Sequence, residues 1–296
     1  MKKILRLLLS LLLVAMSLVM IAQPVTVTLQ VNYENEAIVY HNSPVLLIVS
    51  IANQEARQAE RLNNSADQYL DELKDRLNKK KITKEEYDAD VKLLSSTKKQ
   101  IVKTTIGSAA QPWVSKISWE IIDVKTKEKI SLPIKLLQNP EPEAAAELGS
   151  SQSYFAFFGI DPDQLKKIKA GDYALLADVD GNKSEPILLK IQEGNMTKTI
   201  EESEEQLINI ARYYWHSNMP ADGFLYVNRV LKKNENSIEG LSLRGDLYLL
   251  QKKYLLALDD YNKALKIYYK KNSSTAEAPE YLIDMIAVVK EKMETK

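Results

Sequence analysis

Alternating hydrophobic and polar positions mark the first segment of the chain as a β-strand with one buried face. Every second residue there is apolar: Val25, Val27, Leu29 and Val31. After the break at Asn42-Ser43-Pro44, the nearly continuous β-branched run from Val45 to Ile51 is typical of a central strand. We therefore expect β-structure over residues 25–52.

The apolar spacing then changes to steps of three and four residues, which predicts a pair of helices. A single stripe along residues 54–79 consists of Ala56, Ala59, Leu62, Ala66, Leu70, Leu73 and Leu77. Thr83 and Glu86 have the spacing of a capping box, so a second helix is expected to begin there. Its apolar face is formed by Tyr87, Val91, Leu94 and Ile101. Residues 54–104 should thus form a helical hairpin. Most of its apolar surface is needed to join the two helices, which favours a solvated arm over a docking or dimerisation arm.

Strand patterns resume after the hairpin. Further strands are predicted at 114–124, 130–137, 154–160, 173–179 and 186–191. Between them, Asp161 is expected to cap a short helix that has Pro162 in its first turn. Asp180-Gly181 predicts a hairpin turn. The chain therefore has about seven short strands, interrupted by one helical hairpin.

The segment Leu165 to Tyr173 resembles the tyrosine corner of immunoglobulin-like β-sandwiches. The resemblance implies that the Tyr173 hydroxyl bonds back to upstream backbone and that Trp119 is the large aromatic residue of the core. The chain contains no cysteine, so the resemblance is to the wider sandwich class, which lacks the disulfide of antibody domains. We predict an antiparallel sandwich from residues 23–53 plus 105–195, with the hairpin inserted between its second and third strands.

From about Ile200 to the end, the pattern is helical and repeats with a shift of 34 residues. The matching pairs are Leu207 and Leu241, Ala211 and Gly245, Tyr214 and Tyr248, Gly223 and Ala257, Val227 and Tyr261, Val230 and Ala264, and Leu231 and Leu265. This period, with small residues where helices touch, resembles the tetratricopeptide (TPR) family over residues 203–270. The whole segment 199–296 is predicted as a TPR-like helical array, and Tyr281 to Met293 as its capping helix.

The resemblance implies a concave surface that binds a peptide or protein segment. By helical phase, its candidate partner-binding residues are Asn209, Arg212, Trp215, His216, Ser242, Asp246 and Leu249. Two repeats are few for an independent array. The alternative is therefore that the protein's own tail helix fills this groove, and the sequence leaves both possibilities open.

The N-terminus has the layout of a secretory signal peptide. A basic start, Met1 to Arg6, precedes an uncharged run of 16 residues, Leu7 to Ala22. That run is shorter than the roughly 20 residues that span a bilayer. Cleavage after Ala22 is therefore favoured over the alternative, an uncleaved membrane anchor. We predict residues 1–22 to be a signal peptide and the chain to be exported. The absence of cysteine fits a bacterial envelope, either the periplasm or the cell surface.

Charge and motifs exclude several functions. The formal net charge is zero, so no basic field attracts nucleic acid. The two histidines, His41 and His216, lie in different predicted domains, and no catalytic, phosphate-binding or metal-binding motif surrounds them. No catalytic residue, metal or cofactor is expected. The lysines at the hairpin tip, Lys79 to Lys81, give at most a weak contact with an anionic membrane.

These patterns together predict an α+β multidomain protein in which an immunoglobulin-like sandwich precedes a TPR-like array. The expected function is that of a non-enzymatic interaction or assembly protein whose partner is another protein or peptide. The alternative is a sandwich module that binds a glycan or other ligand through exposed Trp113 or Tyr154. A third possibility is an enzyme whose site the sequence does not reveal. The oligomeric state stays open.

Overall fold

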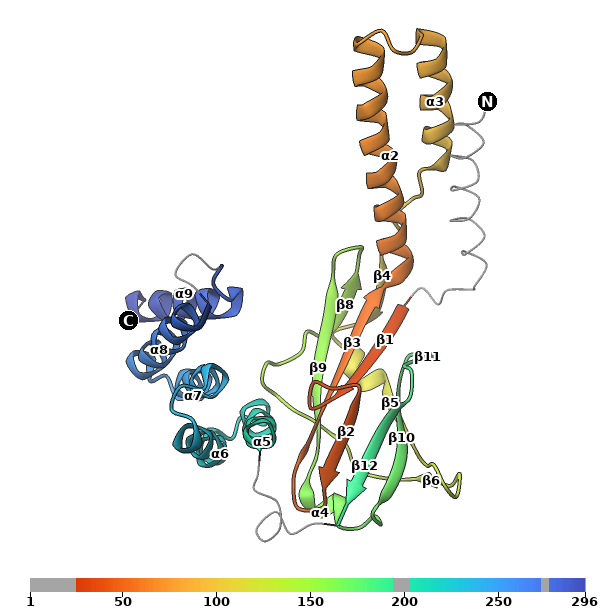
Figure 1. Ribbon diagram of the computed structural model, residues 1–296. Helices are drawn as coiled ribbons and strands as arrows, with labels where there is room; N and C mark the ends of the chain where they lie inside the picture. Colours follow the sequence, from red (N-terminus) through yellow and green to blue (C-terminus); the bar gives the residue numbers. More distant parts are fainter. Residues whose placement is uncertain (1–24, 194–202, 273–276, 296) are drawn as a thin grey trace.

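The computed structural model describes residues 25–193, 203–272 and 277–295. Figure 1 shows an α+β protein in which N-terminal sheets precede C-terminal helices. The predicted signal peptide, residues 1–22, lies outside the described residues. Among the residues that are described, none of the helices combines the length and the apolar character needed to cross a membrane.

Three sheets make up what we call the β region, residues 25–53 and 104–193. The first sheet contains, from edge to edge, β1 (Val25–Val31), β3 (Val45–Asn53), β9 (Ser153–Ile160) and β7 (Lys135–Leu136). The second contains β2 (Glu36–Tyr40), β12 (Ile187–Gln192), β10 (Gly171–Val179), β5 (Ile117–Asp123) and β6 (Lys129–Ile130), with β11 (Asn182–Lys183) paired to β10. A small third sheet pairs β4 (Thr104–Gly107) with β8 (Ala145–Leu148). The named pairs are antiparallel except for the parallel pair β2–β12.

The main core lies between the first two sheets, where the inward-facing residues of both belong to one buried cluster. Val27 from β1 and Leu175 from β10 are two of its members. Burying one such side chain stabilises the fold by about 1.5–3 kcal/mol. Tyr173 also lies in this core, and its hydroxyl donates a hydrogen bond of 2.8 Å to the Lys169 carbonyl, so the predicted bond to upstream backbone is confirmed.

The continuous apolar run of β3 is explained by burial on both faces. Val45, Leu47, Val49 and Ile51 point into the main core. Leu46 and Ile48 point the other way and form a second buried cluster with Tyr213 of a C-terminal helix. A strand covered on both sides cannot alternate between apolar and polar residues.

The β region differs from the predictions at residues 130–137 and at Trp119. Residues 130–137 do not form one strand, because Pro133 cannot donate to a ladder; the chain instead contributes β6 to the second sheet and β7 to the first. Trp119 is not the most buried tryptophan. It is half-buried and packs edge-to-face on Phe158 with ring centroids 5.1 Å apart, whereas Trp113 is fully buried.

The helical hairpin consists of α2 (Gln54–Asn78) and α3 (Lys84–Thr97), and Figure 1 shows it projecting from one end of the β region. Helix α2 follows β3 directly, and Asn53 caps it by accepting a bond of 2.8 Å from Ala56 N. The predicted capping box of Thr83 and Glu86 is confirmed. Ile101, predicted on the second helix, lies beyond its end. The helix stops earlier because the backbone at Lys99 bonds in both directions to the side chain of Asn63.

The C-terminal helices are α5 (Glu204–His216), α6 (Pro220–Lys233), α7 (Ile238–Leu250), α8 (Tyr254–Asn272) and α9 (Glu280–Glu294). Residues that match at a shift of 34 have matching burial; Leu207 and Leu241, for example, are both fully buried. The small residues do lie at helix contacts, since a Cβ on Gly245 would come within 2.7 Å of the Tyr261 ring. Helix α9 buries Leu282, Ile286 and Val289 in one cluster with α8.

Helix α5 joins the C-terminal helices to the β region. The Tyr213 hydroxyl donates to Asp161 Oδ1 at 2.5 Å, and Lys135 Nζ donates to the same oxygen at 2.8 Å. Asp161 therefore does not cap α4 (Pro162–Leu165) with its side chain, contrary to expectation, although it precedes that helix. Gly159 lies under the Tyr213 ring, where a Cβ would be 2.6 Å from Cε2. The two parts of the chain thus meet in a close, specific contact.

Candidate functional site

A cavity of about 450 Å³ lies between the β region and the C-terminal helices, and we call it the junction cavity. It is lined by Tyr33, Pro140, Phe157, Arg212, Trp215, His216, Glu239, Ser242, Leu243, Asp246 and Tyr281. Five predicted partner-binding residues are therefore brought together here: Arg212, Trp215, His216, Ser242 and Asp246. The helical phase explains this, because residues three and four apart share one face of α5 and of α7.

The other two predicted residues lie elsewhere. Asn209 lines a separate cleft nearer the start of α5. Leu249 does not line the junction cavity; it is partly buried and packs against the apolar cluster of α8 and α9. Leu249 comes three residues after Asp246, but its side chain lies on the side of α7 that contacts the neighbouring helices. The phase of a single helix does not show which of its sides contacts other helices.

Tyr33 belongs to the β region and packs against the face of α5 that lines the cavity. It lies in the turn between β1 and β2, where Asn32 and Tyr33 have φ of 52° and 69°. Its hydroxyl lies 3.1 Å from His216 Nε2, and the Arg212 guanidinium lies 4.5 Å from the centroid of its ring. The β region thus supplies part of the cavity wall. No local pattern in the sequence links this turn to a helix more than 170 positions away.

His216 is fixed in place by contacts at both ring nitrogens. Nδ1 lies 2.6 Å from the Asn139 carbonyl, which can only accept, so Nδ1 carries the proton and Nε2 accepts from Tyr33. The ring stacks on Phe157 with centroids 3.8 Å apart. Burial, together with the smaller effect of the nearby Arg212, lowers the pKa of His216 to about 4, against the opposing effect of the Asn139 bond. His216 is therefore neutral at pH 7.

Asp246 is a buried carboxylate held by two tyrosines. Tyr261 donates to its Oδ1 at 2.6 Å, and Tyr281 donates to the same oxygen. Burial raises the pKa of Asp246 to about 6, although both tyrosine bonds lower it. Burial also raises the pKa of both phenols, and the adjacent carboxylate adds to this. This group closes the floor of the cavity from within, and Tyr281 brings the start of α9 into it.

Charged groups lie at the mouth of the cavity. Arg212 forms an ion pair with Glu239 and lies 3.4 Å from Asn209 Oδ1. The Glu239 side chain is 51% exposed, so this pair is accessible to a ligand. Trp215 is only partly buried, and its ring lies 4.5 Å from that of His216. The arrangement offers aromatic walls and an ion pair at the rim.

Six lining residues were not predicted from the sequence: Tyr33, Pro140, Phe157, Glu239, Leu243 and Tyr281. Glu239 could have been predicted, because it lies three residues before Ser242 on the same face of α7. Pro140 and Phe157 come from the β region, and their positions depend on how the two parts of the chain dock. That docking has no signature in the spacing of the residues.

The glycan-binding alternative loses one of its two residues. Trp113 was expected to be exposed, but it is 0% exposed and belongs to the main core. It lies in a short 3₁₀ turn, Trp113–Lys116, whose backbone is tied to the chain before β8 through Trp113 N and the Ala144 carbonyl at 2.9 Å. Tyr154 is partly buried against the same core.

No metal site is evident in the described ranges, where no group of three or more histidine, aspartate or glutamate side chains is placed to hold an ion. Comparison with protein-family models and with curated protein sequences finds no match to the chain. The chemistry of the junction cavity therefore has to be inferred from its own residues.

Proposed function

We propose that this chain is a non-enzymatic interaction or assembly protein of a bacterial envelope and binds a partner polypeptide in the junction cavity. The observation that carries the proposal is the convergence of five predicted partner-binding residues on one aromatic-walled cavity with an ion pair at its mouth. Pockets of this size hold one or a few side chains. The partner would insert an apolar anchor beside Trp215 and Phe157 and make polar contacts with Arg212 and Glu239.

We further propose that the β region is an immunoglobulin-like sandwich. Its support is the strand order, in which β1-β3-β9-β7 faces β2-β12-β10-β5-β6, together with the bond from Tyr173 back to Lys169. For a TPR-like array, the support is the 34-residue period of burial and the close packing of Gly223 on Leu247 and Gly245 on Tyr261.

Binding is favoured over catalysis by the state of the two buried titratable groups. Both nitrogens of His216 are engaged within the chain, and Asp246 accepts from two phenols. His216 therefore has no free ring nitrogen for the proton transfer that a general acid or base performs, and Oδ1 of Asp246 is already bonded by both phenols. They hold the walls of the cavity in place.

The concave helical face is partly occupied by the protein itself. Tyr33 from the β region and Tyr281 from α9 both cover parts of it. What remains open is too small for a long helical ligand, so we propose a short linear segment as the ligand. In this scheme the β region is one wall of the binding site and not a passive base.

Site-specific cross-linking in intact cells tests the proposal. A photoreactive residue replaces Glu239 at the mouth of the cavity, and, as a control, Lys263 on α8. We expect a discrete cross-linked polypeptide from position 239 only, with Trp215→Ala reducing its yield about tenfold and Leu225→Ala, at an exposed site on α6, leaving it unchanged. Equal yields from both positions, or no effect of Trp215→Ala, would contradict the proposal.

Export is part of the same proposal and rests on the pattern of residues 1–22. N-terminal sequencing of the chain recovered from the envelope should begin at Gln23. A chain that keeps Met1 and stays in the cytoplasm would overturn this part.

A further inference from the structure

Strand β2 is the edge of the second sheet and has an open side. It runs parallel to β12, and the amide of His41, the residue after β2, donates to the Gln192 carbonyl at 3.3 Å. Because backbone groups alternate along a strand, Ala37 and Val39 also direct their N–H and C=O groups toward β12. Glu36, Ile38 and Tyr40 therefore direct theirs away from the sheet.

The outward backbone groups of Ile38 have no partner among the described residues. The carbonyl of Tyr40 is used locally, because it accepts from Ser43 N at 2.9 Å. Edge strands are commonly protected by lysine, proline or a bulge. At the centre of β2 lies instead Ile38, which is 52% exposed. This edge is thus open to pairing with another strand.

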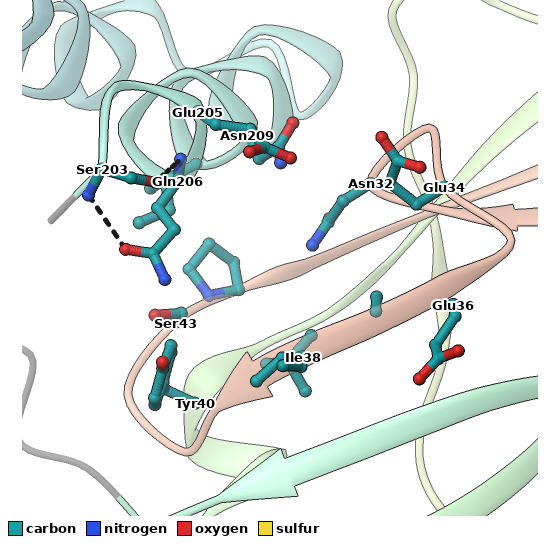
Figure 2. Close-up of a pocket in the computed structure, with 14 residues that line it drawn as sticks. Asn32, Glu34, Glu36, Ile38, Tyr40, Ser43, Ser203, Glu205, Gln206 and Asn209 are labelled. Carbon is teal, nitrogen blue, oxygen red and sulfur yellow. Dashed lines mark hydrogen bonds between the residues drawn. The ribbon is translucent and has the colours of Figure 1, made fainter.

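A cleft of about 280 Å³, the edge cleft, runs between β2 and helix α5. It is lined by Asn32, Glu34, Glu36, Ala37, Ile38, Val39, Tyr40, Ser43, Pro44, Ser203, Glu205, Gln206, Asn209 and Ile210. Figure 2 shows β2 along one side of the cleft and α5 along the other. An incoming chain would therefore lie between the strand edge and a helix wall, which limits the occupant to a single extended segment.

The charge of the edge cleft is acidic. Glu34, Glu36 and Glu205 line it, and none of the described lining residues is Lys, Arg or His. In Figure 2, Glu34 and Glu36 lie on the β2 side and Glu205 on the helix opposite. Glu36 is partly neutralised by its ion pair with Lys190. The cleft still favours a ligand that carries cationic side chains.

The edge cleft and the junction cavity adjoin. Asn32 lines the cleft and the next residue, Tyr33, lines the cavity. On α5, Asn209 lines the cleft and Arg212, three residues later, lines the cavity. One extended polypeptide can therefore lie along β2 and reach the cavity past the tip of the β1–β2 turn.

We infer that the partner polypeptide presents an extended segment of alternating apolar and Lys or Arg residues, which adds to the open edge of β2. This inference rests on the proposed function and names the form of its ligand. Main-chain bonds to Ile38 supply affinity, and the glutamates of the edge cleft select the cationic side chains. A second copy of this chain is disfavoured as the occupant, because edge-to-edge pairing would bring the acidic edge clefts of the two copies together.

Peptide binding to the full chain tests the inference directly. The probe is a fluorescent octapeptide of alternating lysine and valine; alternating glutamate–valine and lysine–proline octapeptides are the controls. We expect only the lysine–valine peptide to bind, because the acidic control is repelled, while the proline control loses every second N–H and its fixed φ disfavours a paired strand. Amide exchange over residues 36–40 should slow on binding, with Ile38 most affected.

Two variants separate backbone pairing from charge. Ile38→Pro removes the outward donor and spares the amides that face β12, so the dissociation constant should rise at least about tenfold. Glu205→Lys reverses one charge of the cleft, lies outside the sheet and should weaken binding similarly. Leu225→Ala on α6 is the matched control and should bind as the unaltered chain does. Thermal unfolding checks that each variant is folded.

The outcomes distinguish this inference from the proposed function. Equal binding of the three peptides, or an Ile38 amide that is already protected without peptide, overturns strand addition. If cross-linking from position 239 persists in both the Ile38→Pro and the Glu205→Lys chains, the partner enters the junction cavity without pairing to β2, and only this inference fails. If position 239 gives no specific cross-link in the unaltered chain, the proposed function fails as well.

Discussion

At the scale of single residues, polar side chains hold the two parts of the chain together. His216 links the β1–β2 turn to the loop at Asn139 through its two ring nitrogens. Tyr213 shares Asp161 with Lys135. Burial would raise the pKa of Asp161, but the bonds from Lys135 and Tyr213 outweigh it and hold this pKa below its usual value. Each bond is worth about 1–3 kcal/mol to the docked state because one partner is charged or buried.

The depressed pKa of His216 predicts how stability depends on pH. The unfolded chain binds a proton at this ring below about pH 6.5, whereas the folded chain excludes it until about pH 4. The free energy of unfolding therefore falls as the pH falls through this interval, by about 2–3 kcal/mol. His216→Gln removes this contribution, so its deficit relative to the unaltered chain should shrink as the pH falls from 7.5 to 4.5.

Urea unfolding at several pH values measures this difference. Asp246, with a pKa raised to about 6, acts in the opposite direction, because the folded chain binds its proton more readily. Both chains share that contribution, so subtraction isolates His216. Parallel stability curves for the two chains would show that the histidine titrates alike in the folded and unfolded states.

At the scale of elements, much of the fold could be predicted from residue spacing. The capping box at Thr83 and the position of α2 needed only local rules. The failures came where a distant contact decides the structure. Ile101 has suitable helical spacing, but the side chain of Asn63 takes the backbone bonds of Lys99 and the helix stops at Thr97. Intrinsic helix propensity has little influence where a tertiary contact of this kind is available.

The hairpin gives a clean test of a local rule. Thr83→Ala removes the bond of 3.2 Å from Glu86 N and should cost α3 about 1 kcal/mol. Amide exchange in α3 should then speed up about fivefold, while exchange in the β region stays unchanged. Ser95→Ala in the same helix is the control and should not speed exchange, since alanine favours helix. Equal acceleration in both variants would show that the cap is not responsible.

At the scale of the whole molecule, the docking of α5 on the first sheet positions the candidate site. The phase of α5 and α7 was sufficient to select Arg212, Trp215 and Ser242. It could not supply Tyr33 or Phe157, because these join the cavity only when the C-terminal helices lie against the β region. The burial of Trp113 was likewise not predicted, because it depends on main-core contacts between segments that are far apart in the sequence.

The docked arrangement should therefore respond to one glycine. Gly159→Ala places a Cβ 2.6 Å from the Tyr213 ring, which its bond to Asp161 holds in place. We expect a loss of about 1–3 kcal/mol and separate unfolding of the C-terminal helices in calorimetry. Gly149→Ala meets only the flexible end of Gln152 and serves as the control. A single unshifted transition in Gly159→Ala would show that the two parts are not coupled there.

Asn53 closes the base of the helical hairpin. Its side-chain oxygen accepts from Ala56 N at the start of α2. Its side-chain nitrogen donates to Val102 O at 3.0 Å and to Thr104 Oγ1 at 3.2 Å, after the end of the hairpin. The chain entering the hairpin and the chain leaving it are therefore bonded to the same amide group. The bonds of Asn53 at the base therefore do not depend on the length of α2 and α3. Deleting seven residues from each helix would shorten the arm by about 10 Å and leave the sheets untouched. The hairpin is thus an adjustable spacer, which sets how far the lysines of its tip stand from the rest of the protein.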